Sequence, residues 1–160
     1  MTEIRYEPIG FVRSPFKETG AMPIQARGAG NVRGAIEILP EFEAGLLDLE
    51  GFSHIILLYH FHRVRKPKLV VTPFLDSQEH GVFATRAPSR PNPIGLSIMR
   101  LLERTANVLE VGNVDVVDGT PVLDIKPYVS EFDRPRADRF GWLEKHQDQV
   151  HSKKSDERFR

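Results

Sequence analysis

The sequence contains no cysteine, which excludes disulfide bonds, thiolate nucleophiles and zinc sites built on cysteine. No apolar run approaches the roughly 20 residues that a membrane-spanning helix needs, and residues 1–5 lack the pattern of a signal peptide. Neither sign of charge is in excess, because 22 basic residues balance 22 acidic ones. These absences predict a cytoplasmic protein that does not coat nucleic acid nonspecifically, while a local basic patch remains compatible with zero net charge.

The chain of 160 residues, 40% of them hydrophobic and 28% charged, is of the size and composition of one globular domain with its own core. Short segments with strand character predominate, and they are separated by turn residues; they cover residues 4–12, 35–39, 52–62, 68–73, 82–84, 96–102, 108–117 and 122–125. Only residues 40–49 and a stretch around 138–143 favour a helix. The βαβ alternation of a nucleotide-binding α/β fold is absent. We therefore predict an all-β protein, mainly an antiparallel β-barrel over residues 1–135, followed at 136–160 by a helix and a charged tail.

The segment of residues 81–95 is the most unusual part of the chain. Arg86 and Arg90 stand four residues apart on a stretch stiffened by Pro88, Pro91 and Pro93, each of which fixes its own φ and restricts the residue before it. A guanidinium is a forked donor suited to carboxylate or phosphate, and a stiff segment loses little entropy when it binds. The pattern indicates a binding loop; a Pro-rich surface loop with solvated arginines is the alternative.

Other polar groups could join such a site. His60 and His62 are two positions apart on an expected strand and so would face one side, which would suit a metal ion given a third ligand, or would simply form a polar face. Asp115 lies among valines, whereas Asp118 stands in the turn at residues 118–121 and could bind amides of that turn. Asp124 and Lys126 alternate on one strand and could form an ion pair.

Two further features are a glycine pair and a basic cluster. Gly28 and Gly30 suggest a dinucleotide-binding loop, but Gly34 is one position late and a strand follows, so that interpretation is rejected. The densest basic cluster follows the most hydrophobic strand and comprises Arg63, Arg65, Lys66 and Lys68. From the residues alone, we expect a ligand pocket formed by the loops at 17–34, 62–68, 86–95 and 113–121, with no indication of the ligand.

Several motifs, in order along the chain, resemble those of the TsaA-like, or TrmO, family. They lie at residues 9–16, 52–54, 81–86, 90–95 and 115–128, so the resemblance covers about residues 4–130. It implies a β-barrel methyltransferase that uses S-adenosyl-L-methionine rather than a Rossmann enzyme. It also implies a homodimer with the cofactor near the subunit interface, and methylation of N6 of the threonylcarbamoylated adenosine next to the anticodon of tRNA.

Residue roles follow from the same resemblance. Cofactor contacts are implied for Pro23, Gln25, Ala26, His62, Arg63, Arg86, Leu96, Asn113, Val114, Asp115 and Val116. Arg86 and Asp118 are the expected catalytic residues, with Arg86 holding the cofactor or the carboxylate of the modified base and Asp118 accepting the N–H of the adenine. Phosphate contacts are expected from Arg65, Lys66, Lys68 and Arg90, and no metal is expected.

The chain also departs from the family pattern. The family often has Pro-Arg-Gln where this chain has residues 23–25 as Pro-Ile-Gln, and often has glutamine where this chain has Arg63. Many bacterial members also carry a further C-terminal domain, which leaves the RNA substrate open. Two alternatives stand beside the methyltransferase: a noncatalytic barrel that senses the cofactor or RNA, and a hydrolase with a metal at His60 and His62.

Overall fold

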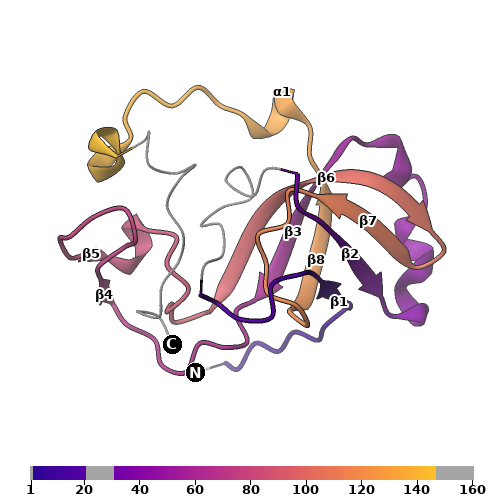
Figure 1. Cartoon of the computed structure of the whole chain (residues 1–160), viewed down its shortest axis with the longest axis horizontal. Helices are drawn as coiled ribbons and strands as arrows, with labels where there is room; N and C mark the ends of the chain where they lie inside the picture. The colour runs from indigo at the N-terminus through magenta and orange to yellow at the C-terminus, as the bar shows by residue number, and fades with distance from the viewer. Residues whose placement is uncertain (1, 21–30, 147–160) are drawn as a thin grey trace.

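The computed structural model describes residues 2–20 and 31–146, and its centre is a closed antiparallel barrel in the order β1–β2–β7–β6–β3–β8 (Figure 1). The barrel strands are β1 (Gly10–Arg13), β2 (Arg33–Ile38), β3 (His54–His60), β6 (Ile94–Thr105), β7 (Val108–Gly112) and β8 (Pro121–Pro127). A two-stranded sheet of β4 (Val70–Val71) and β5 (His80–Gly81) lies to one side of the barrel. The predicted all-β barrel is confirmed, and there is no doubly wound sheet among the described elements.

The barrel closes where β1 pairs with β8, and its strands β3 and β6 alternate regularly between an inner and an outer face. Ile55, Leu57 and Tyr59 of β3 are buried, and their neighbours along the strand are not. The two strands pair without a break from His54↔Arg100 to His60↔Ile94. This period of two matches the pleat, so the apolar set of each strand faces the barrel interior. The prediction of a central strand within residues 52–62 is confirmed.

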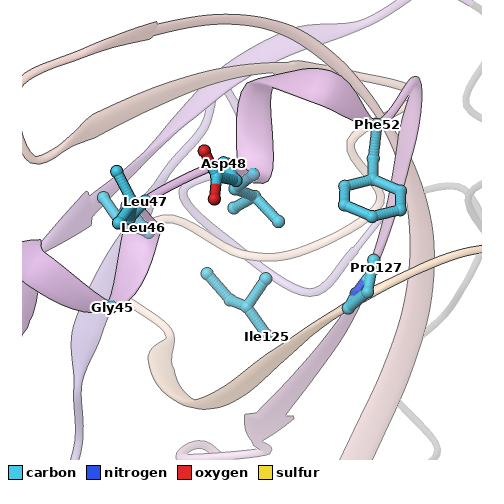
Figure 2. Close-up of a pocket in the computed structure, with 8 residues that line it drawn as sticks. Gly45, Leu46, Leu47, Asp48, Phe52, Ile125 and Pro127 are labelled. Carbon is cyan, nitrogen blue, oxygen red and sulfur yellow. The ribbon is translucent and has the colours of Figure 1, made fainter.

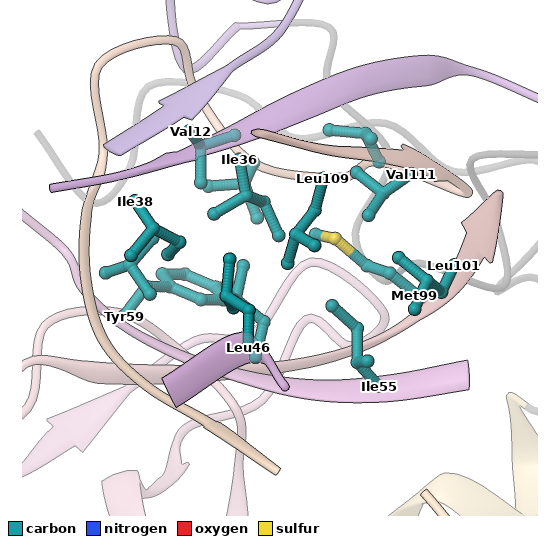
Figure 3. Packing of buried hydrophobic residues seen from close by; sticks show 14 residues of the cluster. Val12, Ile36, Ile38, Leu46, Ile55, Tyr59, Met99, Leu101, Leu109 and Val111 are labelled. Atoms are coloured by element: carbon teal, nitrogen blue, oxygen red, sulfur yellow. The ribbon is translucent and has the colours of Figure 1, made fainter. Parts of the chain in front are cut away.

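Side chains from the strands and from two irregular segments fill the barrel interior (Figure 3). Val12, Ile36, Met99 and Leu109 are fully buried in it. Leu46 enters from η2 (Pro40–Leu46), and the buried valines of residues 114–116 enter after β7. The segment at 113–117 is therefore part of the core, although it is not the strand that its valines predict.

Three other sequence expectations are wrong in detail. Residues 82–84 form the short 3₁₀ helix η4 (Val82–Ala84), because the Thr85 amide bonds back to the Val82 carbonyl. The first strand begins only at Gly10, and Ile4 and Tyr6 are exposed. The helix predicted at 40–49 is of 3₁₀ type and ends at Leu46, and η3 (Leu49–Gly51) follows it.

Beyond β8 the chain forms α1 (Ser130–Asp133) and η5 (Gly141–Lys145). The helix predicted around 138–143 thus corresponds to the short η5. A domain boundary at residue 135 stays a prediction, and residues 147–160 lie outside the described part. Among the described helices, none has the length and apolar character to span a bilayer.

Gly95 gives a direct test of the packing at one end of the barrel. A Cβ there would overlap a ring carbon of Tyr59, and it would also press on Phe61. We expect Gly95→Ala to lower the free energy of unfolding by about 1–3 kcal/mol, since overpacking forces a buried ring to move. Denaturant unfolding measures this. Gly45→Ala is the matched control, because nothing lies within 4 Å of its added methyl group; equal stability of the two variants would contradict the packing described.

Candidate functional site

A chain of hydrogen bonds at one end of the barrel joins β3, β6 and the segment that follows β7. The Tyr59 hydroxyl lies 3.0 Å from Ser97 Oγ, and Ser97 Oγ donates to Asp115 Oδ1 at 2.7 Å. Tyr59 and Ser97 are buried, whereas Asp115 is half-buried. Burial raises the pKa of Tyr59, and the Asp115 carboxylate raises it further, so the phenol keeps its proton. The result is a fixed carboxylate at the barrel mouth.

The backbone of residues 113–116 approaches this carboxylate in a constrained form. Asn113 has a φ of 60°, in the left-handed region that asparagine tolerates better than most residues. Val114 and Val116 turn their side chains into the core, and the Val114 amide donates to the Val32 carbonyl at 3.1 Å. A ligand at this segment would therefore meet backbone groups and the side chains of Asn113 and Asp115.

Asp118 holds the adjoining loops together. Its Oδ1 accepts the Ser14 amide at 2.9 Å and its Oδ2 accepts Lys17 Nζ at 2.8 Å. The hydrogen bond from Lys17, followed by that from Ser14, holds the pKa of Asp118 below its ordinary value. Asp118 therefore bonds the loop of residues 14–17 rather than amides of its own turn. Arg63 joins the same group, because its guanidinium donates to the Lys17 carbonyl at 2.8 Å.

Arg86 and Arg90 differ sharply in their surroundings. Arg86 is exposed, and its positive charge acts against the rise in the pKa of Tyr59, which places it near the polar chain. Arg90 instead donates through Nη1 to the carbonyls of residues 82, 85 and 87, at 3.0, 2.8 and 3.3 Å. It braces the loop that carries Arg86, and its predicted phosphate contact stays a prediction.

The two histidines do not share a strand. β3 ends at His60, and the His62 amide turns back to the His60 carbonyl at 2.8 Å, so the expectation that both histidines lie on one strand is wrong. Partial burial lowers the pKa of His62, and the charge of Arg63 lowers it further, so its imidazole is neutral near pH 7. Within the described residues, no three histidine or acidic side chains converge as metal ligands do.

The remaining predicted residues lie in three places. Leu96 is on the outer face of β6, with 52% of its surface exposed. Arg65, Lys66 and Lys68 are exposed on the segment after β3, which is tied to the Arg86 loop by a bond from the Lys68 amide to the Ser89 carbonyl. Pro23, Gln25 and Ala26 lie outside the described residues.

An apolar pocket lies at the opposite end of the barrel (Figure 2). It is lined chiefly by Leu46, Leu49, Phe52, Ile125 and Pro127. These residues adjoin the start of β3, where Ile55 pairs with Pro127, whereas the polar chain adjoins its end, where Tyr59 pairs with Val122. The pocket has a carboxylate but no basic side chain in its wall, so we place the candidate site at the polar end.

A second hollow, open to solvent, adjoins that polar end. Arg13, Lys17 and Arg33 lie around it, together with Asp118. Sequence reasoning missed Ser14, Lys17, Tyr59 and Ser97 as parts of the site. The one available signal was Ser97, a polar residue at an inward position of β6 between Gly95 and Met99.

The closed antiparallel barrel, which carries a buried hydroxyl bonded to a carboxylate, places this protein outside the Rossmann class. Residues 11–134 match the tRNA-methyltransferase O N-terminal domain, TrmO_N, and the chain belongs to this family.

Known relatives agree with this assignment. The chain is 54% identical over 156 residues to a probable S-adenosyl-L-methionine-binding protein of Pyrococcus abyssi, covering 98% of this chain and 85% of that protein. It is 38% identical over 144 residues to the tRNA (adenine(37)-N6)-methyltransferase of Escherichia coli, covering 81% of this chain and 59% of the enzyme. The crystal structure of TrmO from Pseudomonas aeruginosa superposes with a TM-score of 0.73 at 42% identity, covering 89% of this chain and 63% of that one. The chain thus spans about three fifths of the last two proteins.

Proposed function

We propose that this protein is an S-adenosyl-L-methionine-dependent methyltransferase that acts on N6 of the threonylcarbamoylated adenosine next to the anticodon of tRNA. The observation that carries the proposal is the half-buried Asp115 carboxylate, fixed by Ser97 at the barrel mouth with Arg86 nearby. Family membership and the named activity of the E. coli relative support it.

The polar end has the donor and acceptor groups that the cofactor requires. Arg86 can pair with the carboxylate of its methionine part, while Asp115 can accept from its ammonium or ribose hydroxyls. His62, neutral near pH 7, does not repel a cation. The segment 113–116 would contribute backbone contacts, and Pro23, Gln25, Ala26, Arg63 and Leu96 remain proposed contacts. When bound, the cofactor would supply a methyl group on a cationic sulfur. A nitrogen that attacks the methyl carbon in line would release the sulfur as a neutral thioether.

The residues of this chain contribute mainly by positioning. The N6 atom of the modified adenosine carries one hydrogen, which would leave as a proton to solvent as the bond from N6 to the methyl carbon forms. Asp118 is the proposed acceptor of that N–H, although its oxygens already hold Ser14 and Lys17 and its pKa is lowered. A carboxylate of low pKa is a weak base, so its contribution would be mainly orientation and electrostatic attraction. Arg86 is also suited to the carboxylate of the threonylcarbamoyl group.

The cationic groups near the site support a tRNA-binding face. Arg65, Lys66 and Lys68 are exposed beside the Arg86 loop, and Arg13, Lys17 and Arg33 border the adjoining hollow. Lysine and arginine side chains at such positions would contact phosphates of the anticodon stem and loop.

An exposed apolar row on the barrel wall supports the proposed homodimer. Ile94, Leu96, Ile98 and Leu102 face outward along β6, each with 38–52% of its surface exposed. Ile56 and Leu58 of β3 pair directly beside Ile98 and Leu96. Arg100, which is also exposed, interrupts the row between Ile98 and Leu102. The apolar part from Ile94 to Ile98 suits a protein interface, and a second copy there would bring Leu96 to the subunit boundary.

Titration with S-adenosyl-L-methionine by calorimetry, followed by a methylation assay on tRNA that carries the modified adenosine, tests the function. We expect one cofactor per chain and methyl transfer to N6. Arg86→Ala should weaken cofactor binding about tenfold or more, since a charge-assisted contact is lost. Asp118→Asn should lower kcat roughly tenfold with little change in cofactor affinity, since a charge-assisted contact that orients the N–H is weakened.

Arg5→Ala is the control for loss of one arginine, because Arg5 is exposed and bonded only to Glu3 among the contacts described. Cofactor binding without methyl transfer would favour a noncatalytic sensor barrel. Wild-type affinity in Arg86→Ala would remove that arginine from the cofactor site.

Removing the three cations of the basic segment tests the RNA face. Arg65→Ala/Lys66→Ala/Lys68→Ala should weaken tRNA binding. The slope of log affinity against log salt should become shallower by about two to three, because each lost phosphate contact accounts for roughly 0.7–0.9 of that slope. Filter binding over a salt series measures both quantities. Arg134→Ala/Arg136→Ala/Arg139→Ala removes the same charge beyond β8; an equal loss in this control would show that only net charge matters.

Sedimentation of the purified protein tests the dimer. We expect a dimer for the wild type and a monomer for Ile98→Glu, because a charge would be buried in the apolar contact. Leu47→Glu, at a residue with 74% of its surface exposed near the opposite end of the barrel, should leave the dimer intact. A wild-type monomer at micromolar concentration would contradict the proposal.

A further inference from the structure

The segment of residues 130–146, the C-terminal strap, leaves β8 and crosses to the side where β4 and β5 lie (Figure 1). Residues 130–141 are exposed, so the strap gains little from burial along this part of its course. Its contacts gather instead at its far end, on Trp142 and His146, which are both half-buried. The strap therefore contacts the rest of the protein mainly at its far end and not along its whole length.

Trp142 makes the main contact. Its indole Nε1 donates to the Ala84 carbonyl of η4 at 2.8 Å. Its ring stacks on His80 of β5, with centroids 4.7 Å apart and planes 17° from parallel. The Trp142 side chain therefore contacts both β5 and η4, the two elements that immediately precede Arg86.

Asp76 supports the contact between Trp142 and His80, because its carboxylate lies beside both His80 and His146. Its Oδ2 lies 2.8 Å from His80 Nε2, and its Oδ1 lies 3.9 Å from His146 Nε2. The Asp76 carboxylate also caps the amides of Ser77 and Gln78, at 2.7 and 3.2 Å. His80 is thus held in place as the platform on which the indole stacks.

The loop gripped by Trp142 is internally rigid. Arg90 Nη1 ties together the carbonyls of Val82, Thr85 and Ala87, and Thr85 Oγ1 donates to Val82 and accepts the Ala87 amide. A loop braced in this way moves as one body, so a contact at Ala84 fixes the direction of its other members. Arg86 lies two residues beyond Ala84, inside the braced stretch.

We propose that Trp142 is a positioning residue that acts through the Ala84 carbonyl and His80 to hold the Arg86 loop in its working orientation. The proposal rests on the function proposed for Arg86. It makes the strap a part of the site, although the strap does not line the barrel mouth.

A double-mutant cycle tests the proposal. Trp142→Ala should lower kcat/KM for tRNA methylation by roughly tenfold, since small displacements of a positioned group are costly. In the Arg86→Ala background the same change should have no further effect, because the two residues act as one unit. Trp142→Phe keeps a ring over His80 but cannot donate to Ala84, so it should lie between the wild type and Trp142→Ala.

Phe132→Ala is the matched control, since Phe132 is an aromatic residue of the same strap with 80% of its surface exposed; it should retain wild-type activity. Full additivity of Trp142→Ala and Arg86→Ala, or wild-type kcat/KM in Trp142→Ala, would overturn the proposal. Circular dichroism checks that the barrel of each variant is folded.

Hydrogen exchange separates this proposal from the proposed function, because it needs no substrate. Amides of residues 82–90 should exchange faster in Trp142→Ala than in the wild type, while amides of the β3 and β6 strands remain unchanged. Unaltered exchange at 82–90 would refute the docking role. A wild-type protein that neither binds the cofactor nor methylates tRNA would refute the proposed function, whereas the exchange result would still test the docking of the strap.

The chain has a single tryptophan, so its fluorescence gives an independent readout of docking in the wild type and in Phe132→Ala.

Discussion

The hydrogen-bond chain from Tyr59 through Ser97 to Asp115 is the interaction on which the polar end of the molecule depends. It connects neighbouring strands β3 and β6 to a segment that has no strand partner of its own, and it does so inside an apolar barrel. A buried hydroxyl without a partner would cost free energy, so the three groups favour one joint arrangement. The carboxylate that emerges at the mouth is thereby fixed before any ligand arrives, which is the condition for binding without a large cost in ordering.

The regular pleat of β3 and β6 separates three environments along the same two strands. Inward residues build the core, except at Ser97, where one polar position starts the site. Outward residues from Ile94 to Ile98 of β6, with Ile56 and Leu58 of β3 beside them, form an apolar row that suits a second subunit. The two ends of the barrel then differ, since Phe52 and its apolar neighbours surround one and Asp115 and Asp118 the other. The core, the proposed interface and the candidate site are thus separated by strand geometry rather than by separate domains.

Patterns with a short-range cause could be predicted from the sequence. The alternation in β3, the turn at Gly119 with its φ of 77°, and the 2.7 Å ion pair of Asp124 and Lys126 all follow from neighbours along the chain. Features that depend on partners distant in the sequence could not be predicted in this way. Asp118 meets Ser14 and Lys17 about a hundred residues away, and the short apolar run at 82–84 becomes a 3₁₀ turn held by Arg90 and Trp142. The family motifs include Arg86, Asp115 and Asp118, because a family pattern carries information about distant partners that residue patterns lack; the roles of these residues stay predictions.

Arg86 and Arg90 show why proline content alone does not explain the stiffness of their loop. Both arginines stand in the same proline-rich stretch, and composition gives no reason to treat them differently. In the fold, Arg90 donates to the carbonyls of Thr85 and Ala87, and it adds a bond to the Val82 carbonyl, which Thr85 already contacts. Arg86 therefore lies on a braced loop. The Ala84 carbonyl is satisfied from the strap instead. On this proposal the orientation of Arg86 depends both on Arg90, within its own loop, and on Trp142, which lies 56 positions later in the sequence. A change at either residue should therefore alter the position of Arg86.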